Sequence, residues 1–299
     1  MKIAVTAEVP ADKKNVGEQL RTGTTIRQSL LADDTPDGLN FTVNRTEWLP
    51  DSRTNTTPRH HHAFQQIRWA ESGSVNFAPD QDISERDIAY FPRGTWYGPQ
   101  LRDQGISVTI QFGFHGEKQH GSSFWKRYEA EAMARLKARG TFQEGSYIEA
   151  DPVTGEKQQR DAVQALYEEQ YALHTNQKFV VPPEGYAAPI LMHPAAFDYY
   201  TAAPGVEIKQ LGRFYDHPGP DGDVALAMVR LSKGGTYIFD SRRAQVAWTI
   251  TAGLQIDGKI YPEGTYLYIP RDERAVIASS DCVELYVVEF PRLDPSPER

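Results

Sequence analysis

Three consecutive histidines, His60 to His62, have the residue types and spacing for chemistry at a metal or a proton-transfer site. On an extended strand, successive side chains point to opposite faces, so His60 and His62 share one face and His61 lies on the other. Gln66 has the same parity as His62 and is expected on the same face. A pair of imidazoles suits iron, copper, nickel and zinc alike. The spacing therefore predicts a transition-metal site with Gln66 as a weak third ligand, although a solvated strand end without metal would show the same run.

The segment around these histidines resembles the two sequence motifs of the cupin superfamily. The first motif is H-x-H followed by Glu and then Gly, and its positions are occupied by His60, His62, Gln66 and Gly73. The second motif is G-D, a hydrophobic strand, P-x-G and a histidine, and its positions correspond to Asp87, Pro92, Gly94 and Tyr97. Two ligand positions match the family, whereas Gln66 stands in place of Glu and Tyr97 in place of His.

This resemblance implies a jelly-roll β-barrel with the site in its interior. In cupins the four ligand positions usually hold iron, manganese, nickel or zinc, which here would be bound by His60, His62, Gln66 and Tyr97. The reaction implied is dioxygenation of a small organic acid or aromatic compound by an oxidoreductase. Two alternatives stay open. One is a metal-free isomerase or cyclase in which His62 or Tyr97 moves a proton, and the other is a binding protein without catalysis.

The elements predicted along the chain fit such a barrel. Short β-branched and aromatic runs bounded by Gly, Pro or Asp, such as GSVNFAP, RDIAYFP and ISVTIQFGF, predict antiparallel strands. An apolar stripe at helical spacing predicts a helix over residues 122–139 with Gly140 as its stop, and a second stripe predicts a helix over residues 156–174. Both helices are expected to pack on the barrels.

The last third of the chain repeats the pattern of short strands. Trp69–Gly73 resembles Thr249–Gly253, and YFPRGTWY resembles YIPRDERA. Counting back from Gly253 gives Asp240, Arg242 and Val246 as the positions equivalent to His60, His62 and Gln66, and Ala275 stands at the position of Tyr97. The second copy is therefore expected to lack a metal site. The sequence predicts a mainly β, two-barrel (bicupin) protein with the site-bearing barrel in residues 1–118, a helical connection in 119–180 and a second barrel in 181–299.

The remaining histidines are weaker candidates. His115 and His120 could supply the missing fourth ligand if the chain folds back over the barrel mouth. His193 and His217 each precede a proline, which predicts extended loop positions. The sequence contains no P-loop, G-x-G-x-x-G, G-x-S-x-G or H-E-x-x-H motif, so no nucleotide cofactor is expected.

Composition and charge limit the classes of partner that can be expected. A net charge of −8 without a basic cluster argues against nucleic acid and favours a small-molecule substrate. Neither a signal peptide nor a long apolar run is present, so no membrane partner is expected. The single cysteine, Cys282, predicts a reducing, cytoplasmic location, and its surroundings predict a buried strand position. In two-domain cupins a copy that has lost its site commonly serves as a scaffold or dimerising half, so the resemblance implies a scaffold role for residues after about 181 and allows a homodimer.

Overall fold

The computed structural model describes residues 1–14, 20–34, 39–50, 55–102, 104–113, 122–215 and 222–292. The chain forms two compact units that are interleaved in sequence. The histidine unit consists of Ala11–Arg27 and Asn44–Leu191, and the C-terminal unit consists of Met1–Pro10, Gln28–Val43 and Met192–Arg299. The predicted division at residues 118 and 180 stays a prediction.

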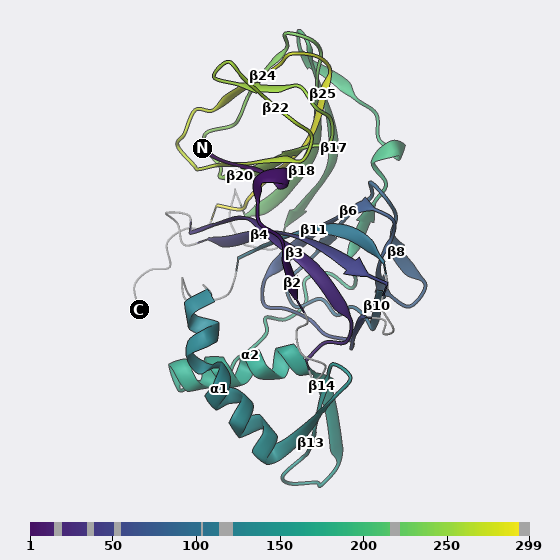
Figure 1. Ribbon diagram of the computed structural model, residues 1–299, viewed down its shortest axis with the longest axis vertical. Helices are drawn as coiled ribbons and strands as arrows, with labels where there is room; N and C mark the ends of the chain where they lie inside the picture. Colours follow the sequence, from purple (N-terminus) through teal and green to yellow (C-terminus); the bar gives the residue numbers. More distant parts are fainter. Residues whose placement is uncertain are drawn as a thin grey trace. The chain divides into compact units, whose positions relative to one another are not determined.

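The fold is mainly β with antiparallel sheets, as the sequence predicts (Figure 1). One seven-stranded sheet has the order β15-β9-β6-β11-β4-β3-β2, and the other has the order β1-β23-β20-β25-β18-β17-β16. When β15 and β1 at the edges are set aside, the remaining strands follow the same relative order in both sheets. This shared topology agrees with the repeat seen in the sequence.

The strands of the two large sheets have the following bounds. The first contains β2 (Asp12–Lys14), β3 (Thr24–Asp34), β4 (Asn40–Leu49), β6 (Gln65–Ser72), β9 (Ile88–Phe91), β11 (Gly105–Phe112) and β15 (Ile190–Met192). The second contains β1 (Lys2–Val5), β16 (Tyr200–Ala203), β17 (Val206–Tyr215), β18 (Asp223–Leu231), β20 (Gln245–Thr249), β23 (Thr265–Ile269) and β25 (Val283–Glu289).

Smaller sheets and 3-10 helices accompany the two large sheets among the described residues. The paired strands are β5 (Asn55–Thr57) with β10 (Gln100–Arg102) and β7 (Val75–Ala78) with β8 (Gln81–Ile83). A four-stranded sheet contains β19 (Thr236–Ile238), β21 (Leu254–Ile256), β22 (Lys259–Tyr261) and β24 (Val276–Ser279). The two 3-10 helices are η1 (Thr6–Glu8) and η2 (Pro194–Ala196).

Strand β6 positions the candidate site because both of its faces are buried. Ala70 lies in a hydrophobic core with Phe91 and Tyr97. Gln66 and Arg68 have the same parity as Ala70 and therefore face the same interior. Polar groups in such an interior need hydrogen-bond partners, since an unpaired buried donor costs about 1–3 kcal/mol.

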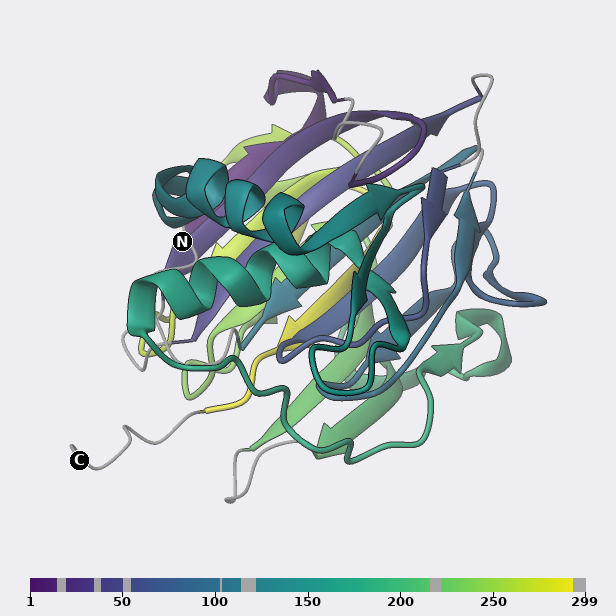
Figure 2. The same ribbon diagram turned by 90° about the horizontal axis from the view of Figure 1, so that it is seen from below.

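The helical part of the histidine unit contains α1 (Ser122–Arg139) and α2 (Ala162–Thr175), which lie side by side in Figure 2. The predicted first helix and its end before Gly140 are confirmed. The predicted second helix begins too early, because residues 157–161 form β14 and the Asp161 side chain caps α2 by accepting from the N–H of Gln164 at 2.8 Å.

The two helices share a hydrophobic core with a three-stranded sheet that the sequence did not predict. This sheet contains β12 (Gly140–Gln143), β13 (Ser146–Ala150) and β14 (Lys157–Asp161). The shared core contains Ala132, Leu136, Tyr147, Ala165 and Leu166. The expectation that both helices pack on the barrels is therefore wrong for the faces that form this core.

Two further expectations can be compared with the structure. Cys282 is exposed just before β25, so the predicted buried strand position is wrong. Across the described ranges, none of the helices combines the length and the apolar character needed to span a bilayer.

Candidate functional site

Backbone hydrogen bonds fix the histidine segment to the loop that follows β9. The amides of His60 and Tyr97 each donate to the carbonyl of the other at 3.0 Å, which makes an isolated antiparallel bridge. The amide of Gly94 donates to the carbonyl of His62 at 2.7 Å. Gly94 has φ +75°, a conformation that glycine adopts without the penalty of a side chain. These bonds place the two motifs side by side.

The imidazoles follow the predicted alternation. His60 is 4% exposed, and its ring centroid lies 4.8 Å from that of His62. His61 lies apart from this pair, because its ring stacks on Trp96 at 3.8 Å. His60 Nδ1 lies 2.7 Å from the carbonyl oxygen of Pro58, which can only accept. His60 therefore carries its proton on Nδ1 and presents an unprotonated Nε2.

Tyr97 is the centre of a buried hydrogen-bond network. Its ring lies 4.4 Å from the His60 ring and 5.9 Å from the His62 ring, measured between centroids. Its hydroxyl oxygen accepts from Gln66 Nε2 at 3.0 Å and from Arg68 Nη2 at 3.0 Å. Both acceptor sites of the hydroxyl are thus occupied, and its own proton is left to donate. The structure brings together all four predicted site residues, while their individual roles stay predictions.

Burial sets the protonation states of these groups. It lowers the pKa of His60 to about 4 and lowers the pKa of His62 well below its ordinary value, so both imidazoles are neutral near pH 7. Burial also raises the pKa of Tyr97, against the opposing effect of the Arg68 charge. The site therefore holds two neutral bases and one protonated phenol.

Two arginines in this interior were missed by the sequence interpretation. Arg68 lies over the ring of Phe91 at 4.4 Å, and its Nε donates to Gln66 Oε1 at 3.1 Å. Arg102 lies over the ring of Trp48 at 4.7 Å. The charge of Arg68 and burial both lower the pKa of Arg102, with burial the larger effect. Arg68 could have been found from its parity with Gln66, whereas Arg102 ends a three-residue strand that offers no such pattern.

Comparison with known proteins identifies the fold. No family model matches the sequence, and no curated protein is similar to it. A solved structure from Nostoc punctiforme, provisionally assigned as a dioxygenase, superposes with a TM-score of 0.55 at 10% identity, over 99% of this chain and 84% of its own. Oxalate decarboxylase from Bacillus subtilis at pH 4.6 superposes with a TM-score of 0.51 at 12% identity, over 98% of this chain and 76% of its own. The fold is of the cupin type.

Cupins usually hold a metal, and the Bacillus oxalate decarboxylase is described with manganese(II) centres. His60 and His62 supply two suitable nitrogens here. The third predicted ligand is a weak one, because the Gln66 amide is uncharged and its Oε1 already accepts from the Arg68 guanidinium. Two buried guanidinium groups also oppose a divalent cation electrostatically. Within the described residues no group of three or more His, Cys, Asp or Glu side chains is arranged to hold a metal ion. The donor set therefore does not fit a resident divalent ion.

The second large sheet keeps a glutamine but has apolar residues in place of His60, Arg68 and Tyr97, and its equivalent positions differ from those predicted. Gln66 pairs with Phe91, and in the second sheet Gln245 pairs with Ile269, so Gln245 replaces Val246 as the counterpart of Gln66. Phe239 donates its amide to the carbonyl of Ala275 as His60 does to Tyr97. Phe239 is therefore the counterpart of His60, in place of Asp240. The assignment of Ala275 to the Tyr97 position agrees with this bridge.

The count from Gly253 fails because the turn after β20 is one residue longer than the turn after β6. By the corrected register, Ala247 takes the place of Arg68. Phe239, Ala247 and Ala275 all belong to the hydrophobic core of the C-terminal unit. Arg242, expected near this interior, is mostly exposed and pairs with Asp240 at 2.6 Å.

The other histidines do not join the site in the described part of the chain. His115, His120 and His217 lie outside the described residues. His193 has φ −103° and ψ 96°, which confirms the extended position expected before a proline. His174 Nδ1 lies 3.2 Å from the hydroxyl of Tyr128 at the end of α2.

Proposed function

We propose that the interior of the histidine unit is the active site of a small-molecule enzyme that transfers protons without a metal, in the isomerase or cyclase class. One observation carries this proposal. The Tyr97 hydroxyl accepts two hydrogen bonds and keeps its own proton to donate, beside an imidazole whose Nε2 is unprotonated. An acid and a base thus lie next to each other in the buried interior, with ring centroids 4.4 Å apart.

The roles of the side chains follow from this arrangement. His60 Nε2 accepts a proton from the substrate, and His62 lies next to it as a second neutral imidazole. The Tyr97 hydroxyl gives a proton to the substrate atom where negative charge develops. Arg68 and Gln66 donate to the oxygen of Tyr97 and stabilise the phenolate that forms. The proton taken by the imidazole returns to the phenolate when the cycle closes.

The metal-dependent oxidoreductase predicted from the sequence is the second candidate. The observation that favours it is the free Nε2 of His60 beside His62, because a ligating histidine commonly binds its second ring nitrogen to a carbonyl, as His60 does with Pro58. A dioxygenase acting on an organic acid or aromatic compound would use these two nitrogens. The engaged Gln66 counts against it.

Hydrogen exchange with solvent tests the first proposal. The purified chain, treated with EDTA and dialysed, is incubated in D₂O with a panel of carboxylic and hydroxy acids, and NMR follows deuterium incorporation at carbon. We expect exchange into at least one compound. Tyr97→Phe and His60→Gln should each lower its rate by about 10²-fold to 10⁴-fold, and His61→Gln should retain it.

The same samples separate the two candidates. Elemental analysis of untagged protein and oxygen uptake after adding iron(II) or manganese(II) test the metal-dependent alternative. If exchange is absent without metal, or is equally fast in Tyr97→Phe, the proton-transfer proposal is wrong. Metal at one equivalent together with oxygen uptake would support the dioxygenase instead.

A further inference from the structure

Arg68 and Arg102 occupy the same interior, and their guanidinium groups are incompletely paired. Arg68 is 7% exposed, and its Nη1 is buried without a hydrogen-bond partner in the described structure. Arg102 donates through Nε to the carbonyl of Asn76 at 3.0 Å, while its buried Nη2 has no partner there. Each arginine thus keeps a charged N–H donor unused.

No described carboxylate lies within ion-pair distance of either group. Arg21, a third arginine near the site, is different, because it pairs with Asp161 at 2.8 Å. That carboxylate is committed to Arg21 and to the first turn of α2. Among the described residues two positive charges therefore have no compensating carboxylate in a low-dielectric interior, which is costly unless an anion is present.

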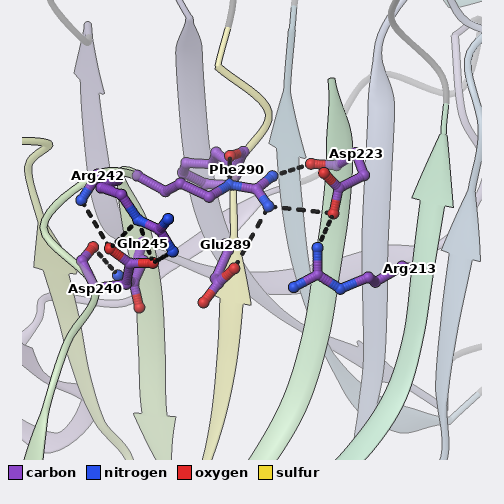
Figure 3. A network of polar contacts seen from close by, with 8 residues as sticks. Arg213, Asp223, Asp240, Arg242, Gln245, Glu289 and Phe290 are labelled. Atoms are coloured by element: carbon purple, nitrogen blue, oxygen red, sulfur yellow. Dashed lines mark hydrogen bonds and ion pairs between the residues drawn. The ribbon is translucent and has the colours of Figure 1, made fainter. Parts of the chain in front are cut away.

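The C-terminal unit shows how this chain otherwise compensates buried guanidinium groups (Figure 3). Arg243 is 5% exposed and pairs with Asp223 at 3.1 Å and with Glu289 at 3.4 Å. It also donates through Nε to the carbonyl of Phe290 at 2.9 Å. Arg213 shares Asp223 at 2.9 Å. In this network each arginine has a carboxylate partner. Arg68 and Arg102 in the histidine unit differ from it, because no described carboxylate pairs with them.

We propose that Arg68 and Arg102 together bind the carboxylate of an organic acid, which is the substrate class of the site described above. That the bound acid is a substrate rests on the proposed function, whereas the binding itself does not depend on catalysis. The planar guanidinium fork matches the two oxygens of a carboxylate. The bound anion would neutralise the buried charge and leave its adjacent carbon near the imidazole and the phenol.

The surroundings of the two arginines favour an organic acid over inorganic phosphate. Arg68 lies on the ring of Phe91 and Arg102 on the ring of Trp48. Tyr97 and Phe91 also pack together, with ring centroids 4.8 Å apart. An apolar carbon skeleton can contact these aromatic faces, whereas a fully hydrated tetrahedral anion would lose water against them.

Binding of named probes to the full chain tests the inference. Acetate, malonate, succinate, benzoate and inorganic phosphate are titrated at constant ionic strength, with succinamide as the uncharged match for succinate. Calorimetry gives the dissociation constant, and thermal unfolding gives an independent stabilisation. We expect at least one carboxylate to bind and to raise the unfolding midpoint, with succinamide inactive and phosphate weaker.

Variants assign the binding to the two arginines. Arg68→Met and Arg102→Met should each weaken the best carboxylate by about tenfold to a hundredfold. Arg102→Lys, which keeps the charge but loses the fork, should fall between wild type and Arg102→Met. Arg45→Met is the matched control, because Arg45 in the same unit is already paired with Glu71 at 2.7 Å and should leave the affinity unchanged.

The outcomes distinguish this inference from the proposed function. If wild type binds none of the carboxylates, or binds phosphate and carboxylates equally, the inference is overturned whether or not the variants fold. Affinity that is unchanged in both methionine variants overturns it as well. Carboxylate binding that depends on the arginines and persists in Tyr97→Phe, without any hydrogen exchange, would keep the anion site and remove the proton-transfer function.

Discussion

Burial keeps the imidazole of His60 neutral, and this makes folding sensitive to acid. The unfolded chain takes up a proton at this position near pH 6.5, whereas the folded chain does so only near pH 4. The unfolded state therefore binds more protons between these values, so the free energy of unfolding is greatest above pH 6.5 and falls as the pH drops toward 4. The difference between the pKa of His60 in the folded and the unfolded chain corresponds to roughly 3 kcal/mol in the free energy of unfolding.

We expect urea unfolding at pH 7.5 and pH 5 to show this loss in wild type and to show a smaller loss in His60→Gln. Glutamine occupies the same space with hydrogen-bonding groups but does not titrate in this range. The comparison of the two pH values within each protein removes the fixed cost of the substitution. Equal pH dependence in both proteins would contradict the assignment of a buried neutral imidazole.

At the residue scale, the sequence placed four of the site residues through the period of two in a strand and through the resemblance to cupin motifs. His60, His62, Gln66 and Tyr97 do converge. The arginines were missed because charged residues are usually exposed, so a strand arginine gives no warning that it is buried. Only the structure shows that Arg68 lacks a carboxylate partner among the described residues, and that fact changes the expected ligand from a cation to an anion.

At the scale of elements, Gly94 connects the loop after β9 to the segment before β15. A Cβ built on Gly94 would lie 2.5 Å from the carbonyl oxygen of Pro182 and 3.0 Å from the amide nitrogen of Glu184. The Gly94 amide also holds His62. Any side chain at this position must displace backbone and disturb the imidazole pair.

We expect Gly94→Ala to lower the free energy of unfolding by roughly 3 kcal/mol or more and to weaken carboxylate binding. Gly155→Ala is the control, because Gly155 has almost the same φ, +74°, with nothing within 4 Å of the built Cβ. It should cost only the backbone strain, about 1–2 kcal/mol. Denaturant unfolding measures both variants, and equal losses would show that the contact with Pro182 is unimportant.

The element boundaries show where sequence periodicity is a sufficient guide. Helix α1 is read correctly because its apolar stripe and the following glycine agree. The predicted start of α2 is wrong because residues 157–161 show no alternation of apolar and polar side chains that would indicate a strand. Their pairing with β13 is a tertiary contact that the local sequence does not reveal. The copy-to-copy register fails for a related reason, since one extra turn residue shifts each side chain to the opposite face of the strand.

At the scale of the whole molecule, the repeat in the sequence correctly indicated two sheets of equal strand order, while the interleaving of the units was not readable from it. The first residues of the chain belong with the last third. Strand β1 pairs along its length with β23, from Lys2 opposite Tyr268 to Val5 opposite Thr265. This pairing joins parts of the chain that are separated by more than two hundred and fifty residues, which no local pattern can predict.

The position of β1 leads to a prediction about truncation. Deleting Met1–Pro10 removes the edge strand beside β23 and leaves the amides and carbonyls of Thr265–Tyr268 on that side without their partners. It also removes Thr6 and Val9, whose carbonyls accept from Gln28 Nε2 at 2.8 Å. We expect the loss of these residues to destabilise the C-terminal unit selectively. The predicted boundary at residue 118 would instead assign Met1–Pro10 to the other barrel.

Hydrogen exchange read by mass spectrometry tests this selectivity in the full chain and in the deletion variant. Peptides covering Thr265–Ile269 should exchange faster in the variant, because their protection depends on local opening of the sheet edge. Peptides covering Gln65–Ser72, which lie at the centre of the other large sheet between β9 and β11, should keep their protection. Carboxylate binding should also persist. Faster exchange in Gln65–Ser72 with unchanged exchange in Thr265–Ile269 would mean that the N-terminal strand supports the histidine unit, and the interleaved assignment of the two units would then be wrong.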